Sequence, residues 1–90
     1  MTEDVKRLDN WQVRVGYIDE SMTVAAPFLR GRVGNKMIKN ELILWFDLEE
    51  GVAMTQESIF KIGDPDREWM VQFLAAGNKP EDLEIKGTNH

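Results

Sequence analysis

The clearest pattern of hydrophobic and polar positions lies between Phe28 and Leu48. From position 38 onward the even positions are apolar apart from one asparagine, and this period of two predicts a strand with one buried face. The odd positions are polar at both ends but apolar at Ile43 and Trp45. A strand that is apolar on both faces at its centre is typical of a central strand covered on both sides. The even positions are Ile38, Asn40, Leu42, Leu44, Phe46 and Leu48.

Gly34 and Asn35 predict the turn that leads into this strand, because both residue types tolerate a positive φ. A three-residue loop that includes Lys36 is the alternative. Pairing Val33 with Ile38 and Leu29 with Leu42 keeps apolar side chains on one face of the hairpin. The same register places Arg30, Arg32, Lys39 and Glu41 together on the other face.

Two extended segments precede this strand. Residues 11–18 alternate between apolar and polar side chains and predict the first strand, after a polar lead at residues 1–9 that is frayed or forms one helical turn. A second extended segment covers residues 22–33 and contains Pro27. A proline inside a strand predicts an edge position or a bulge, and the apolar face changes near Pro27, which favours a bulge there.

A turn at residues 49–51 follows the hairpin, because Gly51 can take a positive φ. Residues 52–62 predict a strand that breaks near its middle. The alternative for this segment is a short helix at 56–61 with Thr55 as its cap.

Residues 65–76 predict a helix. Asp64 is a suitable N-cap, Pro65 suits the first helical position and Asp66 favours the positive end of the helix dipole. The helix is apolar around most of its circumference, so we expect it to pack against the sheet and to leave apolar side chains for a further contact. Residues 83–86 alternate and predict a short last strand.

This order of elements predicts an α+β fold: an antiparallel meander sheet of four to five strands with one helix, from the C-terminal half of the chain, packed on it. The layout resembles a small half-open barrel of the SH3-like type, which is the second expectation. This resemblance concerns layout alone, and layout does not determine function. The length of 90 residues predicts one domain, with residues 1–9 and 87–90 as mobile ends.

The composition of the chain indicates the cellular compartment in which it is expected. The chain carries 16 acidic and 11 basic side chains, a formal net charge of -5, and no cysteine. It contains no apolar run of about 18 residues, which a membrane span needs, and its first residues lack the pattern of a signal peptide. Without cysteine there are no disulfides and no thiolate chemistry. These features predict a cytoplasmic protein.

No motif for catalysis, metal binding or a cofactor stands out. The one histidine, His90, is the last residue, so histidine-based acid–base or nucleophilic chemistry lacks its main participant. Asp64, Asp66 and Glu68 offer oxygen atoms to a hard cation, but they lack the further ligands and the glycine of a calcium-binding loop. Helix capping explains the two aspartates better. We therefore expect no enzymatic activity, no metal and no cofactor.

Charge is distributed unevenly along the chain. Residues 21–40 hold four basic and no acidic side chains, whereas residues 41–68 hold eight acidic and two basic side chains. The acidic half predicts a surface that docks on a basic partner protein, through Asp47, Glu49, Glu50, Asp64 and Asp66. The basic hairpin predicts a surface for phosphates, through Arg30, Arg32, Lys36 and Lys39, beside which Phe28 or Tyr17 could stack on bases.

The leading hypothesis is a small protein-binding module without enzymatic activity, such as an accessory or inhibitor protein that blocks a basic surface of its partner. Small acidic, cysteine-free domains are common among such proteins, including phage-encoded ones. The alternative is nucleic-acid binding through the hairpin at residues 28–39, which the net negative charge disfavours. Trp11, Trp45 and Trp69 predict a core, and one of them beside Met37 or Met70 could lie at an interface, including that of a homodimer.

Overall fold

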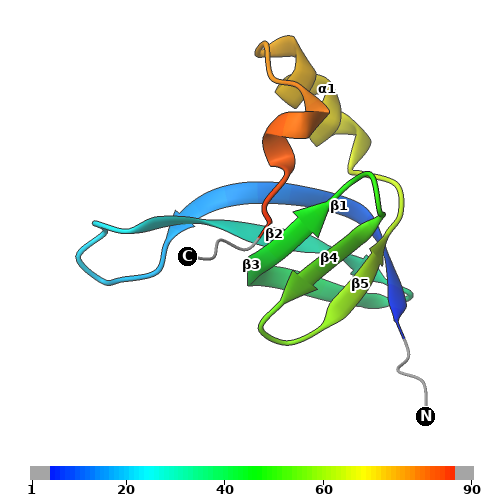
Figure 1. Cartoon of the computed structure of the whole chain (residues 1–90), viewed down its shortest axis with the longest axis horizontal. Coiled ribbons are helices and arrows are strands. Elements are labelled where there is room, and N and C mark those ends of the chain that lie inside the picture. The colour runs from blue at the N-terminus through cyan, green and yellow to red at the C-terminus, as the bar shows by residue number, and fades with distance from the viewer. Residues whose placement is uncertain (1–4, 87–90) are drawn as a thin grey trace.

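Figure 1 shows the chain as a computed structural model, in which residues 5–86 are described. Each strand pairs antiparallel with the next along the chain, and β1 also pairs in parallel with β5, so that the five strands close into a barrel. The predicted α+β meander is confirmed, and the element order takes the small SH3-like layout in a closed form. The elements are β1 (Lys6–Tyr17), β2 (Ala25–Val33), β3 (Lys36–Asp47), β4 (Val52–Thr55), β5 (Ile59–Ile62), α1 (Arg67–Ala75) and the short 3-10 helix η1 (Pro80–Leu83).

The first strand begins earlier than predicted. The expectation of a polar lead is wrong for residues 6–9, because β1 begins at Lys6 and its pairing of Lys6 to Leu8 with β5 closes the barrel. Leu8 is fully buried. One buried residue among polar neighbours leaves no periodic signal, which explains why the sequence pattern misses it. Residues 1–4 and 87–90, which include most of the expected mobile ends, lie outside the described residues.

Two irregularities in β3 explain why this strand is apolar on both faces. The register with β2 shifts around Asn40, which has a φ of 50°, and the register with β4 shifts between Ile43 and Trp45. Each extra residue turns the following side chains to the opposite face. Ile43 is therefore buried, whereas Leu44 is 45% exposed. The prediction that the even positions form one buried face is wrong between the two irregularities, and beyond the second one Phe46 is fully buried again.

The β2–β3 hairpin has the predicted two-residue turn at Gly34 and Asn35. The register differs from the prediction, because Gly31 lies opposite Ile38 and Phe28 lies opposite Leu42. Gly31 is buried against Leu8, and a Cβ atom at Gly31 would lie 3.1 Å from the carbonyl oxygen of Asp9. The missing side chain at position 31 therefore leaves room for β1 to close over β2.

Pro27 lies at an edge and not at a bulge. It pairs with Val15 of β1 in regular register. The pairing of β2 with β3 extends no further in this direction than Phe28. The missing N–H of Pro27 therefore costs no hydrogen bond to β3 in the described part of the chain. The predicted bulge near Pro27 is wrong, and the edge position is the alternative that holds.

A turn at residues 56–58 divides the segment 52–62 into the β4–β5 hairpin, as the predicted break indicates. The alternative helix at 56–61 is wrong. The Thr55 hydroxyl accepts hydrogen bonds from the backbone N–H groups of Glu57 and Ser58, at 3.1 Å each, and donates one to Glu41 at 2.8 Å. The hydroxyl of Thr55 thus stabilises a tight turn and does not cap a helix.

Helix α1 starts later than predicted. Its N-cap is Asp66, whose carboxylate accepts a hydrogen bond from the backbone N–H of Trp69 at 3.0 Å. The predicted cap at Asp64 is wrong, because the backbone of Asp66 donates to the carbonyl oxygen of Trp11 at 2.8 Å and Pro65 forms a bridge with Trp11. The chain is therefore still tied to β1 at the point where Asp64 would have to start the helix.

The helix stands over one end of the barrel and covers little of the sheet (Figure 1). None of its nine residues, all of which the structure describes, is buried, although Trp69, Met70 and Phe73 pack against the core. Val71 and Leu74 point to solvent. The predicted last strand at residues 83–86 is reduced to a single bridge between Ile85 and Phe46.

Trp11 joins the barrel core to the helix. Its ring lies 5.3 Å from that of Phe46 and 5.7 Å from that of Trp69, and Trp69 stacks in turn on Phe73. The indole Nε1 of Trp11 donates to the carbonyl oxygen of Gly63 at 2.8 Å. Trp11 is 2% exposed, so it is the most deeply buried of the three tryptophans that were predicted to lie in the core.

Candidate functional site

Asp47, predicted as part of the acidic contact face, is buried and has a structural role. Its carboxylate accepts hydrogen bonds from the backbone N–H groups of Glu49 and Glu50, at 3.0 and 3.1 Å, and lies 3.5 Å from the ammonium of Lys86. The hydrogen bond from Glu50, together with the charge of Lys86, holds the pKa of Asp47 below its ordinary value. Asp47 organises the β3–β4 turn and is not on the surface that a partner could contact.

Asp47→Asn is expected to lower the free energy of unfolding at pH 7, because the neutral amide loses the ion pair with Lys86. A depressed pKa in the folded state adds stability above the ordinary aspartate value of about 3.9. That contribution disappears as the pH falls through the lower pKa of the folded protein. Urea unfolding at a series of pH values should therefore show the difference between variant and wild type narrowing below about pH 4. A difference that persists unchanged at pH 2 would contradict this role.

Of the remaining acidic residues predicted for the contact face, one caps the helix and the others are exposed. Asp66 is the N-cap of α1, and its carboxylate lies 3.5 Å from the side-chain amide of Gln12. The side chain of Asp64 is 88% exposed, 3.7 Å from Arg7. The N–H of Ile62 donates to the carbonyl oxygen of Gly51 at 2.9 Å, which brings the β3–β4 turn beside the segment leading to Asp64. We call these exposed acidic residues of the two neighbouring segments, Glu49, Glu50 and Asp64, the acidic corner.

The basic hairpin is exposed but does not present one uniform face. Arg30 is half-buried opposite Gln12, and Arg32 lies opposite Met37. Lys36 and Lys39 are exposed. Within residues 5–86 none of these four basic side chains forms an ion pair. The predicted register placed Lys39 on the same face as Arg30 and Arg32. The bulge at position 40 shifts this register, so the predicted alignment is lost.

Sequence reasoning missed the most exposed apolar feature of the chain. The far halves of β1 and β2, with the loop between them, extend beyond the barrel as a two-stranded ribbon, which we call the arm (residues 13–28; Figure 1). Large apolar side chains on a free surface usually occur singly, and a group of them marks an interaction site. Here they include Val15, which is 76% exposed, and Met22, which is 68% exposed. The exposed group is Val15, Tyr17, Ile18, Met22 and Val24.

The loop at the tip of the arm is organised by one carboxylate. Asp19 accepts hydrogen bonds from the hydroxyls of Ser21 and Thr23, and from the backbone N–H groups of Thr23 and Val24 at 3.0 and 2.9 Å. These bonds hold the pKa of Asp19 well below its ordinary value. Met22 has a φ of 58°, which an unbranched non-glycine residue adopts only when its surroundings impose it. The side chain of Met22 projects from this hydrogen-bonded tip and is 68% exposed.

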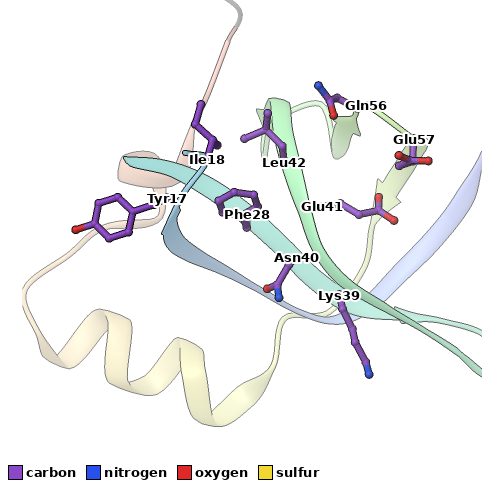
Figure 2. Close-up of a pocket in the computed structure, with 9 residues that line it drawn as sticks. All are labelled: Tyr17, Ile18, Phe28, Lys39, Asn40, Glu41, Leu42, Gln56 and Glu57. Atoms are coloured by element: carbon purple, nitrogen blue, oxygen red, sulfur yellow. The ribbon is translucent and has the colours of Figure 1, made fainter. Parts of the chain in front are cut away.

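A shallow groove of about 690 Å³ runs along the base of the arm (Figure 2). Its apolar part includes Phe28 and Leu42, which face each other across β2 and β3, and Ile18 from the arm. The Phe28 ring covers Gly16, where a Cβ atom would lie only 3.1 Å from it. This packing fixes the aromatic ring at the centre of the groove.

The polar residues of the groove are arranged asymmetrically. Figure 2 shows the carboxylates of Glu41 and Glu57 on one side of the groove, while the ammonium of Lys39 points away from them. Glu41 comes from β3 and Glu57 from the β4–β5 turn. Bringing these residues together depends on the bend of β3, which the sequence pattern does not reveal.

None of the helices within residues 5–86 is both long and apolar enough to cross a membrane. Comparison of the chain with protein-family models, with curated proteins and with solved structures found no match.

Proposed function

We propose that this chain is a small non-enzymatic protein-binding module of the cytoplasm, and that the arm and the groove at its base form the contact surface. The exposed apolar group on the arm is the observation that carries this proposal. Leaving such side chains in water is unfavourable by about 25 cal/mol per Å² of apolar surface. A partner that covers them recovers this free energy.

The hydrogen-bonded loop at the tip of the arm supports the same proposal. Binding normally costs about 0.5–1.5 kcal/mol for each flexible side chain that becomes ordered, and ordering a loop adds to that cost. The Asp19 hydrogen bonds already hold the tip in one conformation. Tyr17 and Met22 are also residue types that are enriched in protein interfaces.

The charges of the chain favour an accessory or inhibitor role in which the module binds a basic partner protein. The net charge of -5 gives the chain a long-range attraction for a basic protein. Within the contact surface, Glu41 and Glu57 lie beside the apolar part of the groove. A module of this kind would inhibit by occupying a surface that its partner needs for another ligand.

Affinity capture from a native lysate, with and without nuclease, tests the proposal. Proteins that remain bound after nuclease treatment and are identified by mass spectrometry are the expected result. Capture of proteins that depends entirely on intact nucleic acid would contradict direct protein binding, and so would the absence of any specific protein.

Nucleic-acid binding remains the second candidate, because Tyr17, Phe28 and Lys39 line the same groove. An aromatic ring beside a cation is the usual arrangement for stacking on a base near a phosphate. However, Glu41 and Glu57 line the same groove and would repel phosphates. In this second case, affinity for an oligonucleotide would fall steeply with salt and be lost in Arg30→Glu/Arg32→Glu.

The acidic corner provides a separate prediction. Glu49→Lys/Glu50→Lys should leave the dissociation rate of the captured protein within about threefold of wild type, since charges away from the contact act mainly on association rates. Figure 1 shows the β3–β4 turn on the side of the barrel that leads into α1, away from the arm. Abolished binding, measured by calorimetry, would instead assign the contact to the acidic corner.

A further inference from the structure

We infer that the groove at the base of the arm accepts an extended segment of the partner protein in which a lysine or arginine is adjacent to an apolar side chain. This inference rests on the proposed function, because it specifies the chemistry of the partner at the same surface. It comes from two features of the groove: an apolar floor and a pair of carboxylates that form no ion pair within residues 5–86.

The floor of the groove favours an aliphatic or aromatic side chain. Phe28 is half-buried, held over Gly16, and flanked by Leu42 and Ile18. The exposed part of this apolar surface faces the groove (Figure 2). A ligand side chain placed there would remove apolar surface of both molecules from water.

The carboxylates favour a cation. The Glu41 carboxylate accepts a hydrogen bond from the Thr55 hydroxyl, and the backbone N–H of Glu57 donates to the same hydroxyl. These bonds hold the carboxylate of Glu41 and the backbone of Glu57 in place. Neither carboxylate forms an ion pair within residues 5–86. Glu41 is half-buried, and at a partly buried site two opposite charges attract each other several times more strongly than in bulk water. The ammonium of Lys39, which lines the same groove, points away from both carboxylates (Figure 2), while Lys6 and Lys36 lie with them around an adjoining cavity.

The shape of the groove favours a chain segment over a small molecule. A small-molecule site normally encloses most of its ligand, whereas this groove is open along its length and is lined by the arm, β3 and the β4–β5 turn. In an extended segment, neighbouring side chains point to opposite sides of the backbone and lie about 3.3 Å apart along it. Such a segment can direct an apolar side chain to Phe28 and a cationic one toward Glu57.

The test begins by panning a library of random 12-residue peptides on the immobilised wild-type chain. Enriched peptides should carry lysine or arginine adjacent to an apolar residue. One enriched peptide is then titrated into wild type, Glu57→Lys and Glu50→Lys, with calorimetry for affinity and amide NMR for location. We expect about a tenfold or greater loss in Glu57→Lys, less than a twofold change in Glu50→Lys, and amide shifts centred on Phe28, Leu42 and Glu57.

Three results would overturn the inference: enriched peptides without a basic residue, equal affinities for the two variants, or shifts outside the groove. A single-stranded oligonucleotide that produces the groove shifts would assign the groove to nucleic acid. Both variants lie in exposed turns, and their amide spectra show directly whether they fold. If the peptide test fails while wild type still captures a protein through the arm, the proposed function stands and only the groove assignment is lost.

Discussion

Trp11→Ala is expected to lower the free energy of unfolding by about 3–5 kcal/mol, the usual cost of removing a large aromatic side chain from a core. Trp11 is 2% exposed and contacts the rings of Phe46 and Trp69. Its removal would also leave the carbonyl oxygen of Gly63 without the indole donor. Since a 90-residue domain has only about 5–10 kcal/mol of stability, this single change should remove a large part of it.

Urea unfolding followed by far-UV circular dichroism measures this effect without depending on the fluorescence of the residue that is removed. Val15→Ala is the matched control, because Val15 lies on the same strand but is 76% exposed. Its effect should stay within about 0.5 kcal/mol. A loss below about 1 kcal/mol for Trp11→Ala would mean that this residue does not join the barrel to the helix as described.

Ile18→Ser/Met22→Ser is expected to weaken binding to the captured protein by at least about 100-fold. Central apolar contacts at protein interfaces cost about 2 kcal/mol or more when truncated, and about 1.4 kcal/mol corresponds to a tenfold change in affinity. Both side chains are exposed in the free chain, at 54% and 68%. The double change should therefore leave the stability of the fold nearly unaltered.

Val71→Ser/Leu74→Ser is the matched control for the arm, since it replaces two exposed apolar side chains of α1 in the same way. Calorimetry should show wild-type affinity for this variant. The reverse pattern, with binding lost in the helix variant and kept in the arm variant, would assign the interface to α1. Sedimentation of both variants also shows whether either surface holds a second copy of the chain.

The types and order of the elements from the first strand to α1 could be predicted from the sequence because each leaves a local signal, whereas η1 in place of a last strand was not predicted. The Gly34–Asn35 turn, the break after Thr55 and the helix with its acidic start are all defined by neighbouring residues. The register of β3 could not be predicted in this way. A bulge at Asn40 depends on one residue taking a positive φ, which any asparagine can do and few do.

The candidate surface was harder to predict than the fold. Apolar residues such as Tyr17 and Val24 look the same in sequence whether the strand that carries them enters the core or extends beyond it. What decides the outcome is the length of the partner strands: β1 pairs with β5 only at Lys6 to Leu8, so its far half leaves the barrel. Conversely, Asp47 looked like a surface charge, although its neighbours bury it.

Site-specific photo-crosslinking tests the central claim, that the arm is the surface that contacts a partner protein. A benzophenone side chain is placed at Met22 on the arm tip, at Glu49 in the acidic corner or at Lys36 in the basic hairpin, and each chain is irradiated in a nuclease-treated native lysate. One strong protein adduct is expected from position 22, with weak or no adducts from positions 49 and 36. A specific adduct from position 49 or 36, with none from position 22, would contradict contact through the arm.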